Sequence, residues 1–402
     1  MYLQTVCIWY RRFLFVNISK GNHKVLSIGK FVRLLTISSF LFISAMRALA
    51  GMSLAEPCIS VDTILDLDKK HLYTREAEVS FSSSIDHWLE GTLTIAAHSH
   101  GHDHGDSHSH GHDHGHDHGH GHSHSCKSHK KEVGVPSFEI HEAFFSSNKL
   151  FSGLSVRAGQ FFLGVGRLNR IHRHDWPFIS SPKVVEEYFG DEGILDSGLE
   201  MSYLAPLLFY LNITAGVTNG RTFGHSCGET GEKPKVPTHY VRVGSFVDAE
   251  DALALSLGLS FLGNENSKGE DKKLFGFDAT AKGEVFGHKY LVQTETWMRH
   301  KKPQGKDLKK SIGTYVFPQV SLNKSFKLGS RFDYFTELGS DEALKKSEYS
   351  LSPTITYEAS EFSSFKLAYN HTVKSQSEKE TTDQGIQLQA VFILGAHPAH
   401  DF

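Results

Sequence analysis

The strongest constraint on the fold is an alternation of apolar and polar residues with a period of two, which recurs after residue 58. In the segment 252–262, large apolar residues fall on one face and small residues on the other. The apolar set is Leu253, Leu255, Leu257, Leu259 and Phe261, and the small set is Ala254, Ser256, Gly258 and Ser260. Because successive side chains of a β-strand point to opposite faces, this period predicts strands with two different faces.

The connections between these segments alternate in length. Short turns at 86–88, 148–153, 249–251, 286–288, 323–325 and 359–361 alternate with long polar loops. A soluble β-sandwich would also alternate, but small and charged residues on the polar face suit a water-filled lumen. Alternating short turns and long loops are typical of outer-membrane barrels. We therefore predict an all-β fold for residues 51–402, an antiparallel transmembrane β-barrel of about sixteen strands.

The predicted strands are 60–67, 75–85, 89–98, 137–147, 154–163, 199–207, 210–219, 239–248, 252–262, 273–285, 289–299, 311–323, 326–336, 347–358, 362–373 and 385–394. An even number of strands puts both ends in the periplasm and the loops 98–131 and 164–198 outside. Glu142 falls in phase with the apolar residues Phe138, Ile140 and Phe144. The pattern therefore requires a bulge or an interfacial position at Glu142.

Residues 1–50 are predicted to be a signal peptide preceded by an N-terminal extension. Basic residues precede the apolar stretch 34–45, and Ala48-Leu49-Ala50 is a suitable cleavage site. A buried strand or helix is the alternative interpretation. Removing the seven basic residues of this region from the chain's 42 leaves 35 against 45 acidic residues, so the mature net charge is about −10. This charge argues against a nucleic-acid partner.

The segment 98–131 is rich in histidine, mixed with Gly, Ser and Asp. Its candidate ligands are His98, His100, His102, His104, His108, His110, His112, His114, His116, His118, His120, His122, His124, His129 and Cys126. Neutral imidazole binds zinc, copper and nickel, and glycine lets the backbone wrap round an ion. A loop without fixed structure binds metal exchangeably, which suits capture and hand-off. The alternative interpretation is a solvated low-complexity linker.

A second candidate metal site is formed by His172, His174 and Asp175, in the predicted outside loop after strand 154–163. Packing of this loop through Trp176, Pro177 and Phe178 is an equally supported alternative. His225 and Cys227 lie in another predicted outside loop and are candidates to join Cys126 as soft ligands. A disulfide or unrelated surface residues are the alternatives there.

Charged residues on the polar faces of the predicted strands are expected to line a pore: Arg157, Lys282, Glu284, Arg331, Asp333 and Lys366. Their mixed signs predict little intrinsic ion selectivity, so any preference for a metal must come from the loops. The sequence holds no nucleophile elbow, phosphate loop or HExxH motif, and we predict that the protein is not an enzyme.

Three stretches together resemble a known family: Arg157-Ala158-Gly159-Gln160-Phe161-Phe162, Gly166-Arg167-Leu168-Asn169-Arg170-Ile171-His172-Arg173-His174 and Trp176-Pro177-Phe178. They are similar to porin-like outer-membrane barrels often labelled zinc-regulated or TonB-dependent outer membrane receptors. The stretches 75–79 and 395–400 fit the same pattern. The resemblance implies a barrel and a role in zinc import. TonB-dependent receptors carry 22 strands and a plug domain, for which this chain has no room, so a passive channel is expected.

These observations lead to one functional hypothesis with two alternatives. The leading hypothesis is an outer-membrane channel whose external histidine-rich loop captures a divalent metal, zinc in first place, as its cargo. The alternatives are a surface metal buffer anchored by a barrel and a general porin. The expected partners are outer-membrane lipid, the barrel-assembly machinery, metal ions and, as a weaker expectation, TonB.

Overall fold

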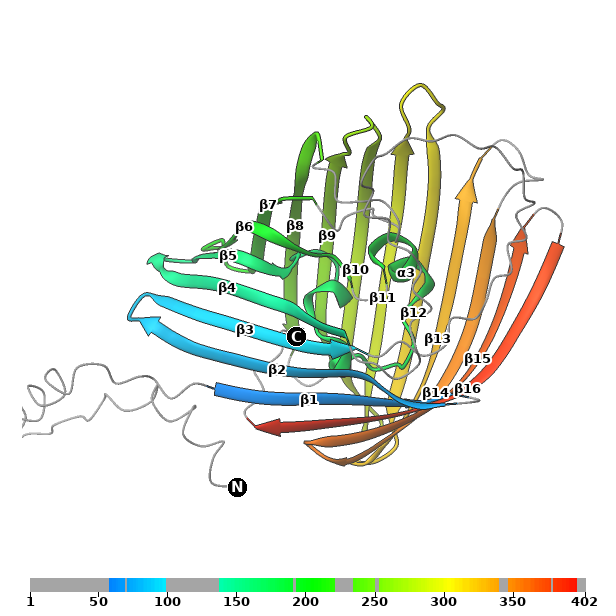
Figure 1. Cartoon of the computed structure of the whole chain (residues 1–402). Coiled ribbons are helices and arrows are strands. Elements are labelled where there is room, and N and C mark those ends of the chain that lie inside the picture. Colours follow the sequence, from blue (N-terminus) through cyan, green and yellow to red (C-terminus); the bar gives the residue numbers. More distant parts are fainter. Residues whose placement is uncertain are drawn as a thin grey trace, which may run out of the picture.

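The computed structural model describes residues 58–68, 71–98, 137–190, 193–220, 234–249, 253–339, 346–376 and 379–395. The strands are β1 (Cys58–Leu67), β2 (Leu72–Asp86), β3 (Leu89–His98), β4 (Ser137–Phe151), β5 (Leu154–Phe162), β6 (Leu195–Leu204), β7 (Tyr210–Thr218), β8 (Val236–Ala249), β9 (Leu253–Glu265), β10 (Asp271–Val285), β11 (His288–Lys302), β12 (Lys309–Ser321), β13 (Phe326–Leu338), β14 (Ser347–Ser360), β15 (Ser363–Gln376) and β16 (Lys379–Gly395). Two 3-10 turns, η1 (Leu168–Arg170) and η2 (Arg173–Asp175), and one short helix, α3 (Lys183–Phe189), complete the described elements (Figure 1). Among the described residues, no helix has the length and apolar character needed to cross a membrane.

The sheet closes on itself. Each strand pairs antiparallel with its neighbours in sequence, and β1 pairs with β16 from Ser60 opposite Gly395 to Leu67 opposite Leu388. The predicted antiparallel barrel is therefore confirmed, and each of its sixteen strands overlaps an expected segment. Closure leaves no unpaired sheet edge. A β-sheet that crosses a bilayer must be closed in this way, because lipid cannot hydrogen-bond to free backbone groups.

The two ends of the barrel differ, as the sequence predicted. At the short-turn end, connections such as 87–88, 152–153 and 286–287 join adjacent strands, and both β1 and β16 also have their outer ends there. At the opposite, long-loop end, the connections include 99–136 and 163–194. The predicted signal peptide, Phe402 and the histidine-rich loop beyond His98 lie outside the described residues.

The outer surface carries the apolar face of the strands. Leu257, Leu259, Phe275 and Phe277 are all exposed, with Leu259 at 62%. Inward neighbours such as Asp278 are buried. An apolar band outside and polar side chains inside are what a barrel in lipid needs.

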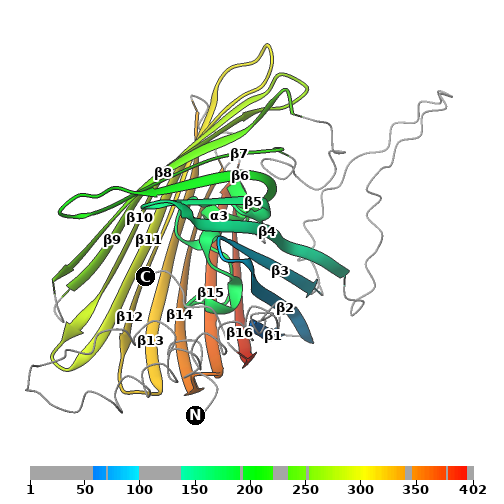
Figure 2. The same ribbon diagram turned by 90° about the vertical axis from the view of Figure 1, so that its left-hand side faces the viewer.

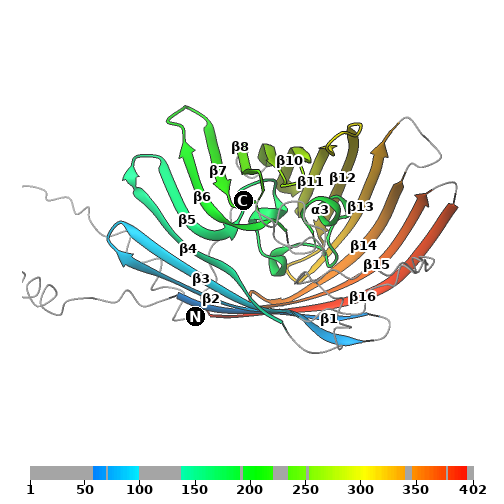
Figure 3. The same cartoon turned by 45° about the horizontal axis from the view of Figure 1, so that its top comes forward.

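Residues 163–194, which connect β5 to β6, fold into the lumen rather than standing outside it. Figure 3 shows α3 enclosed by the strands, and Figure 2 shows it behind β4 and β5. The prediction of an outside loop was wrong because the segment carries too many apolar side chains for an exposed loop. These side chains are Leu163, Val165, Leu168, Trp176, Phe178, Val184, Val185, Tyr188, Phe189 and Ile194. They pack on Tyr240, Leu262, Leu274, Trp297, Tyr315, Phe317 and Phe335 of β8–β13. Each large side chain buried this way contributes about 1.5–3 kcal/mol.

Polar anchors fix this inward segment. Glu295 accepts a hydrogen bond from the Leu168 amide at 2.8 Å, and Arg331 donates to the Ser180 carbonyl and, at 3.0 Å, to its hydroxyl. Lys366 donates to the Trp176 carbonyl at 2.6 Å. With one side of the segment held against β8–β13, residues 172–174 face β2–β4.

Candidate metal centre in the barrel lumen

An irregularity in β4 begins the site. The register between β3 and β4 shifts by one residue, since Thr94 pairs with Glu142 and Ile95 pairs with Ile140. His141 is the extra residue, and this bulge turns both His141 and Glu142 toward the interior, where they are buried. A bulge re-aims side chains in this way at many functional sites. The predicted irregularity at Glu142 is thereby confirmed, while His141 itself was not foreseen.

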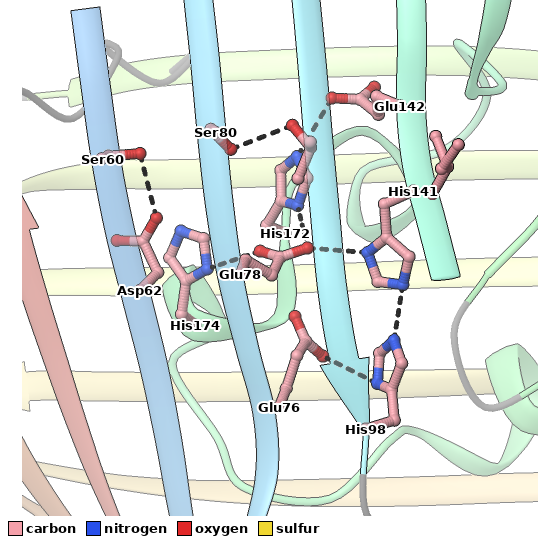
Figure 4. Close-up of polar contacts among 12 residues, drawn as sticks. Ser60, Asp62, Glu76, Glu78, Ser80, His98, His141, Glu142, His172 and His174 are labelled. Carbon is pink, nitrogen blue, oxygen red and sulfur yellow. Dashed lines mark hydrogen bonds and ion pairs between the residues drawn. The ribbon is translucent and has the colours of Figure 1, made fainter. Parts of the chain in front are cut away.

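The strands beside the bulge supply two carboxylates and a second histidine. Glu76 and Glu78 lie two residues apart on β2 and both point inward, and His98 is the last residue of β3. His141 Nδ1 lies 2.7 Å from Glu78 Oε1, and its Nε2 lies 2.7 Å from His98 Nε2 (Figure 4). His98 Nδ1 is 4.0 Å from Glu76 Oε2.

The inward segment brings two further histidines. His172 Nδ1 is 3.1 Å from Glu78 Oε1, and its Nε2 is 3.3 Å from Glu142 Oε2. His174 Nδ1 is 3.3 Å from Glu78 Oε2, and its Nε2 is 3.2 Å from Asp175 Oδ2. The two imidazoles stack with centroids 5.6 Å apart. We call this group the luminal centre; its members are Glu76, Glu78, His98, His141, Glu142, His172, His174 and Asp175.

The luminal centre requires positive charge. Burying carboxylates is costly unless a cation is bound to them. Burial disfavours protonation of His172, but Glu78 and Glu142 outweigh that effect and raise the pKa of His172 well above its ordinary value. Burial likewise opposes protonation of His174, but hydrogen bonds to Asp175 and Glu78 raise its pKa to about 9. With protons as the only cations, both rings are therefore protonated at neutral pH.

A divalent metal would supply the same charge with better geometry. Glu78, His141 and His172 form one group of donor atoms within 4.8 Å of one another, and Glu76, Glu78 and His174 form a second. Imidazole nitrogen and carboxylate oxygen bind zinc at about 2.0–2.2 Å, which places tetrahedral ligand atoms about 3.3 Å apart. The 2.7 and 3.1 Å contacts of Glu78 Oε1 are close to that spacing. A cavity of about 20 Å³ has room for one small ion; Glu76, Glu78, His141 and His172 line it together with Arg173 and with apolar residues of the inward segment.

Two larger cavities adjoin the centre. One, of about 490 Å³, is lined by Glu142, His172 and His174 together with polar residues of β1–β7. The other, of about 980 Å³, is lined by His174, Asp175 and residues of the short turns, including Ser325 and Glu361. The luminal centre therefore lies between the root of the histidine-rich loop and spaces that reach the short-turn end.

The structure brings part of the predicted site together. His98, His172, His174 and Asp175, predicted in two different loops, meet in one centre. Trp176 and Phe178 pack into the core, as the alternative interpretation of that loop predicted, and the metal-site interpretation stays a prediction. The remaining candidate ligands of 100–129, with Cys126, His225 and Cys227, lie outside the described residues.

The expected pore-lining residues face the interior in two different roles. Arg157, Lys282 and Glu284 line the larger cavities. Arg331, Asp333 and Lys366 hold the inward segment: Asp333 accepts from the Lys183 amide at 3.2 Å, and the other two donate to carbonyls of the segment. Lys366 also lines the larger cavity. The alternation of polar and apolar residues predicted that these side chains face the interior, but it could not predict their hydrogen-bond partners.

No family model matches the chain. An uncharacterized protein of Aquifex aeolicus strain VF5 is 28% identical over 298 residues, covering 65% of this chain and 63% of that protein. The chain thus spans less than two thirds of that relative's length.

Solved structures with a similar backbone are outer-membrane proteins. OmpT of Vibrio cholerae has a TM-score of 0.52 at 10% identity, covering 84% of this chain and 97% of its own. The anion-selective porin of Comamonas acidovorans has 0.52 at 12% identity, covering 84% and 98%. Pseudomonas putida OprB has 0.51 at 9%, covering 84% and 94%. At these identities the likeness is one of fold, and the chain has the porin-like outer-membrane barrel fold.

Proposed function

We propose that the protein is an outer-membrane channel that captures a divalent transition metal, zinc in first place, and passes it inward past the luminal centre. One observation carries the proposal: His98 belongs both to the histidine-rich segment and to the luminal centre, where it lies 2.7 Å from His141. An ion captured outside would need no long diffusion to reach a fixed site. Outer-membrane lipid and the barrel-assembly machinery are the partners that this fold implies.

The way the lumen is filled supports the route. The inward segment packs its apolar side chains on β8–β13 and leaves polar residues toward β1–β4. A hydrated ion avoids an apolar contact, so its path runs along the β1–β4 wall. The luminal centre lies on that wall.

The donor set supports the choice of cargo. Three of the donors around Glu78 are imidazoles, which suit zinc, copper and nickel better than calcium or magnesium. The centre lies in a lumen with cavities on its short-turn side, which suits transport of the ion better than storage.

The test is zinc flux into vesicles that contain the purified full-length protein and a zinc-sensitive dye. We expect the double variant His141→Ala, His172→Ala to lower zinc flux about 100-fold, since loss of supporting groups alone costs 10–100-fold in affinity. His300→Ala, whose ring contacts Phe275 on the outer face, is the matched control and should leave flux unchanged. Equal zinc flux in the double variant and the parent would exclude the proposal.

A cellular test separates import from buffering. Cells that carry the double variant should grow poorly under a zinc chelator if the protein imports zinc. Normal growth under chelator with death in excess metal would instead identify a surface buffer anchored by the barrel.

A further inference from the structure

Glu78 faces two different sets of ligands with its two oxygens. Oε1 lies 2.7 Å from His141 Nδ1 and 3.1 Å from His172 Nδ1, whereas Oε2 lies 3.3 Å from His174 Nδ1. Glu76 completes the second set, in which the three donor atoms again lie within 4.8 Å of one another. The centre therefore contains two candidate metal positions with one carboxylate in common. We call them the outer position (His141, His172, Glu78) and the inner position (His174, Glu76, Glu78).

The two positions differ in chemistry. The outer position offers two imidazoles and one carboxylate, and the inner position offers one imidazole and two carboxylates. Nitrogen-rich sets hold zinc and other borderline metals more tightly than oxygen-rich sets do. An ion would thus bind more tightly at the outer position and be released more readily from the inner one.

Their surroundings differ in one respect. Both positions lie beside His98, where the histidine-rich segment begins, since His98 is 2.7 Å from His141 and 4.0 Å from Glu76. His172 and His174 both line the 490 Å³ cavity, but His174 also lines the larger cavity, which reaches the short turns. An ion at the inner position therefore borders the larger cavity.

The two positions do not suit two ions at once. They contain five side chains between them, including the shared Glu78, so two tetrahedral ions would need further ligands. Two dications a few ångströms apart would also repel each other strongly in a buried site.

We propose that a single metal ion occupies these positions in turn and moves from the outer to the inner one by exchanging ligands on Glu78. The ion binds Glu78 Oε2 before it leaves Glu78 Oε1, and His174 and Glu76 replace His141 and His172 as ligands, so the ion is never without a carboxylate partner. No oxidation or reduction is needed; His174 releases its proton to water as it binds the ion, and His172 takes up a proton once the ion has left. The inference rests on the proposed function for its cargo and adds a direction and a mechanism of passage.

The binding test counts imidazoles by zinc X-ray absorption at one equivalent of zinc. The parent for this test is the full-length chain with the histidines of 100–129 replaced by serine, so that only the luminal centre contributes. We expect two imidazoles in this parent, two in His174→Ala and one in His141→Ala. Three imidazoles in the parent would overturn the proposal, because a single merged site would then hold the ion.

The transport test uses the same chains in zinc-flux vesicles. His174→Ala should bind zinc as tightly as the parent, within about threefold, yet lower its flux about 100-fold, since the ion stops at the outer position. Unchanged flux in His174→Ala would overturn the two-position passage. If instead the imidazole counts are as expected but no variant alters flux, the two positions stand as a binding site and the proposed transport function fails.

Discussion

Deleting His141 tests whether the bulge in β4 exists to place a ligand. The neighbouring pairs are Thr94 with Glu142 and Ile95 with Ile140, so removing the residue between them restores a continuous ladder. Every other residue of β4 keeps its partner and its face. We therefore expect the deletion variant to fold into the same barrel, although it loses one of the ligands around Glu78.

The magnitude follows from opposing contributions. Glu78 loses its 2.7 Å contact with His141, worth about 1.5–3 kcal/mol for a charged hydrogen bond, while the repaired ladder regains about 1 kcal/mol. The free energy of unfolding should therefore change by less than about 2 kcal/mol. Zinc affinity should fall about 100-fold, equivalent to about 2.7 kcal/mol.

Urea titration followed by circular dichroism measures the free energy of unfolding, and chelator competition measures the zinc affinity. Both use chains with the histidines of 100–129 replaced by serine. Deleting Ala143 is the control, because Glu142 would then take the place of Ala143 opposite Leu93 and turn toward lipid. That control should fold poorly. A His141 deletion that binds zinc within threefold of its parent, or that fails to form a barrel, would refute the reasoning.

Three further predictions concern the barrel and its inward segment. Arg331→Ala should destabilise the segment by about 3–5 kcal/mol, because it leaves Asp333 buried without its ion-pair partner, and should raise single-channel conductance; unchanged conductance would contradict this. Leu259→Arg, on the outer face, should cost about 2–4 kcal/mol of barrel stability in lipid, measured by urea unfolding, and a neutral effect would place Leu259 away from lipid. Burial opposes ionisation of Glu187, but Lys346 and Lys183 outweigh this effect and lower its pKa below the ordinary 4.5. The stability that the ionised Glu187 gives to the inward segment is therefore present above pH 4.5 and lost as pH falls further. Conductance should therefore change on acidification below that value in the parent and less so in Glu187→Gln.

The strands were predictable because their signal is local. A period of two needs only neighbouring residues, and even the bulge was indicated by Glu142, which falls in phase with the apolar Ile140. The inward course of 163–194 was not predictable in this way, since it depends on Trp297 and Phe317, more than a hundred residues later in the chain. Chain order contains no direct record of such a contact.

Some members of the luminal centre could be predicted from the sequence and others could not. Glu76 and Glu78 share the polar face of one strand, and β3 beside it ends at His98, a juxtaposition that strand order alone would have revealed. His141 left no such trace, because regular alternation assigns it to a face that depends on where the bulge falls. His172 and His174 were recognised as ligands, but their partners on β2 became evident only once the segment was seen to fold inward.

The form of the centre is itself an argument for a bound cation. A sixteen-stranded barrel closes without a bulge in β4, and the inward segment is already held by its apolar side chains and by Glu295, Arg331 and Lys366. Neither the fold nor the filling of the lumen requires the four carboxylates and four histidines of the luminal centre. Departures from regular structure that cost stability without supporting the fold are expected at functional sites. A bound cation would lower the cost of burying Glu76 and Glu78 side by side, as the protonated rings of His172 and His174 do without it.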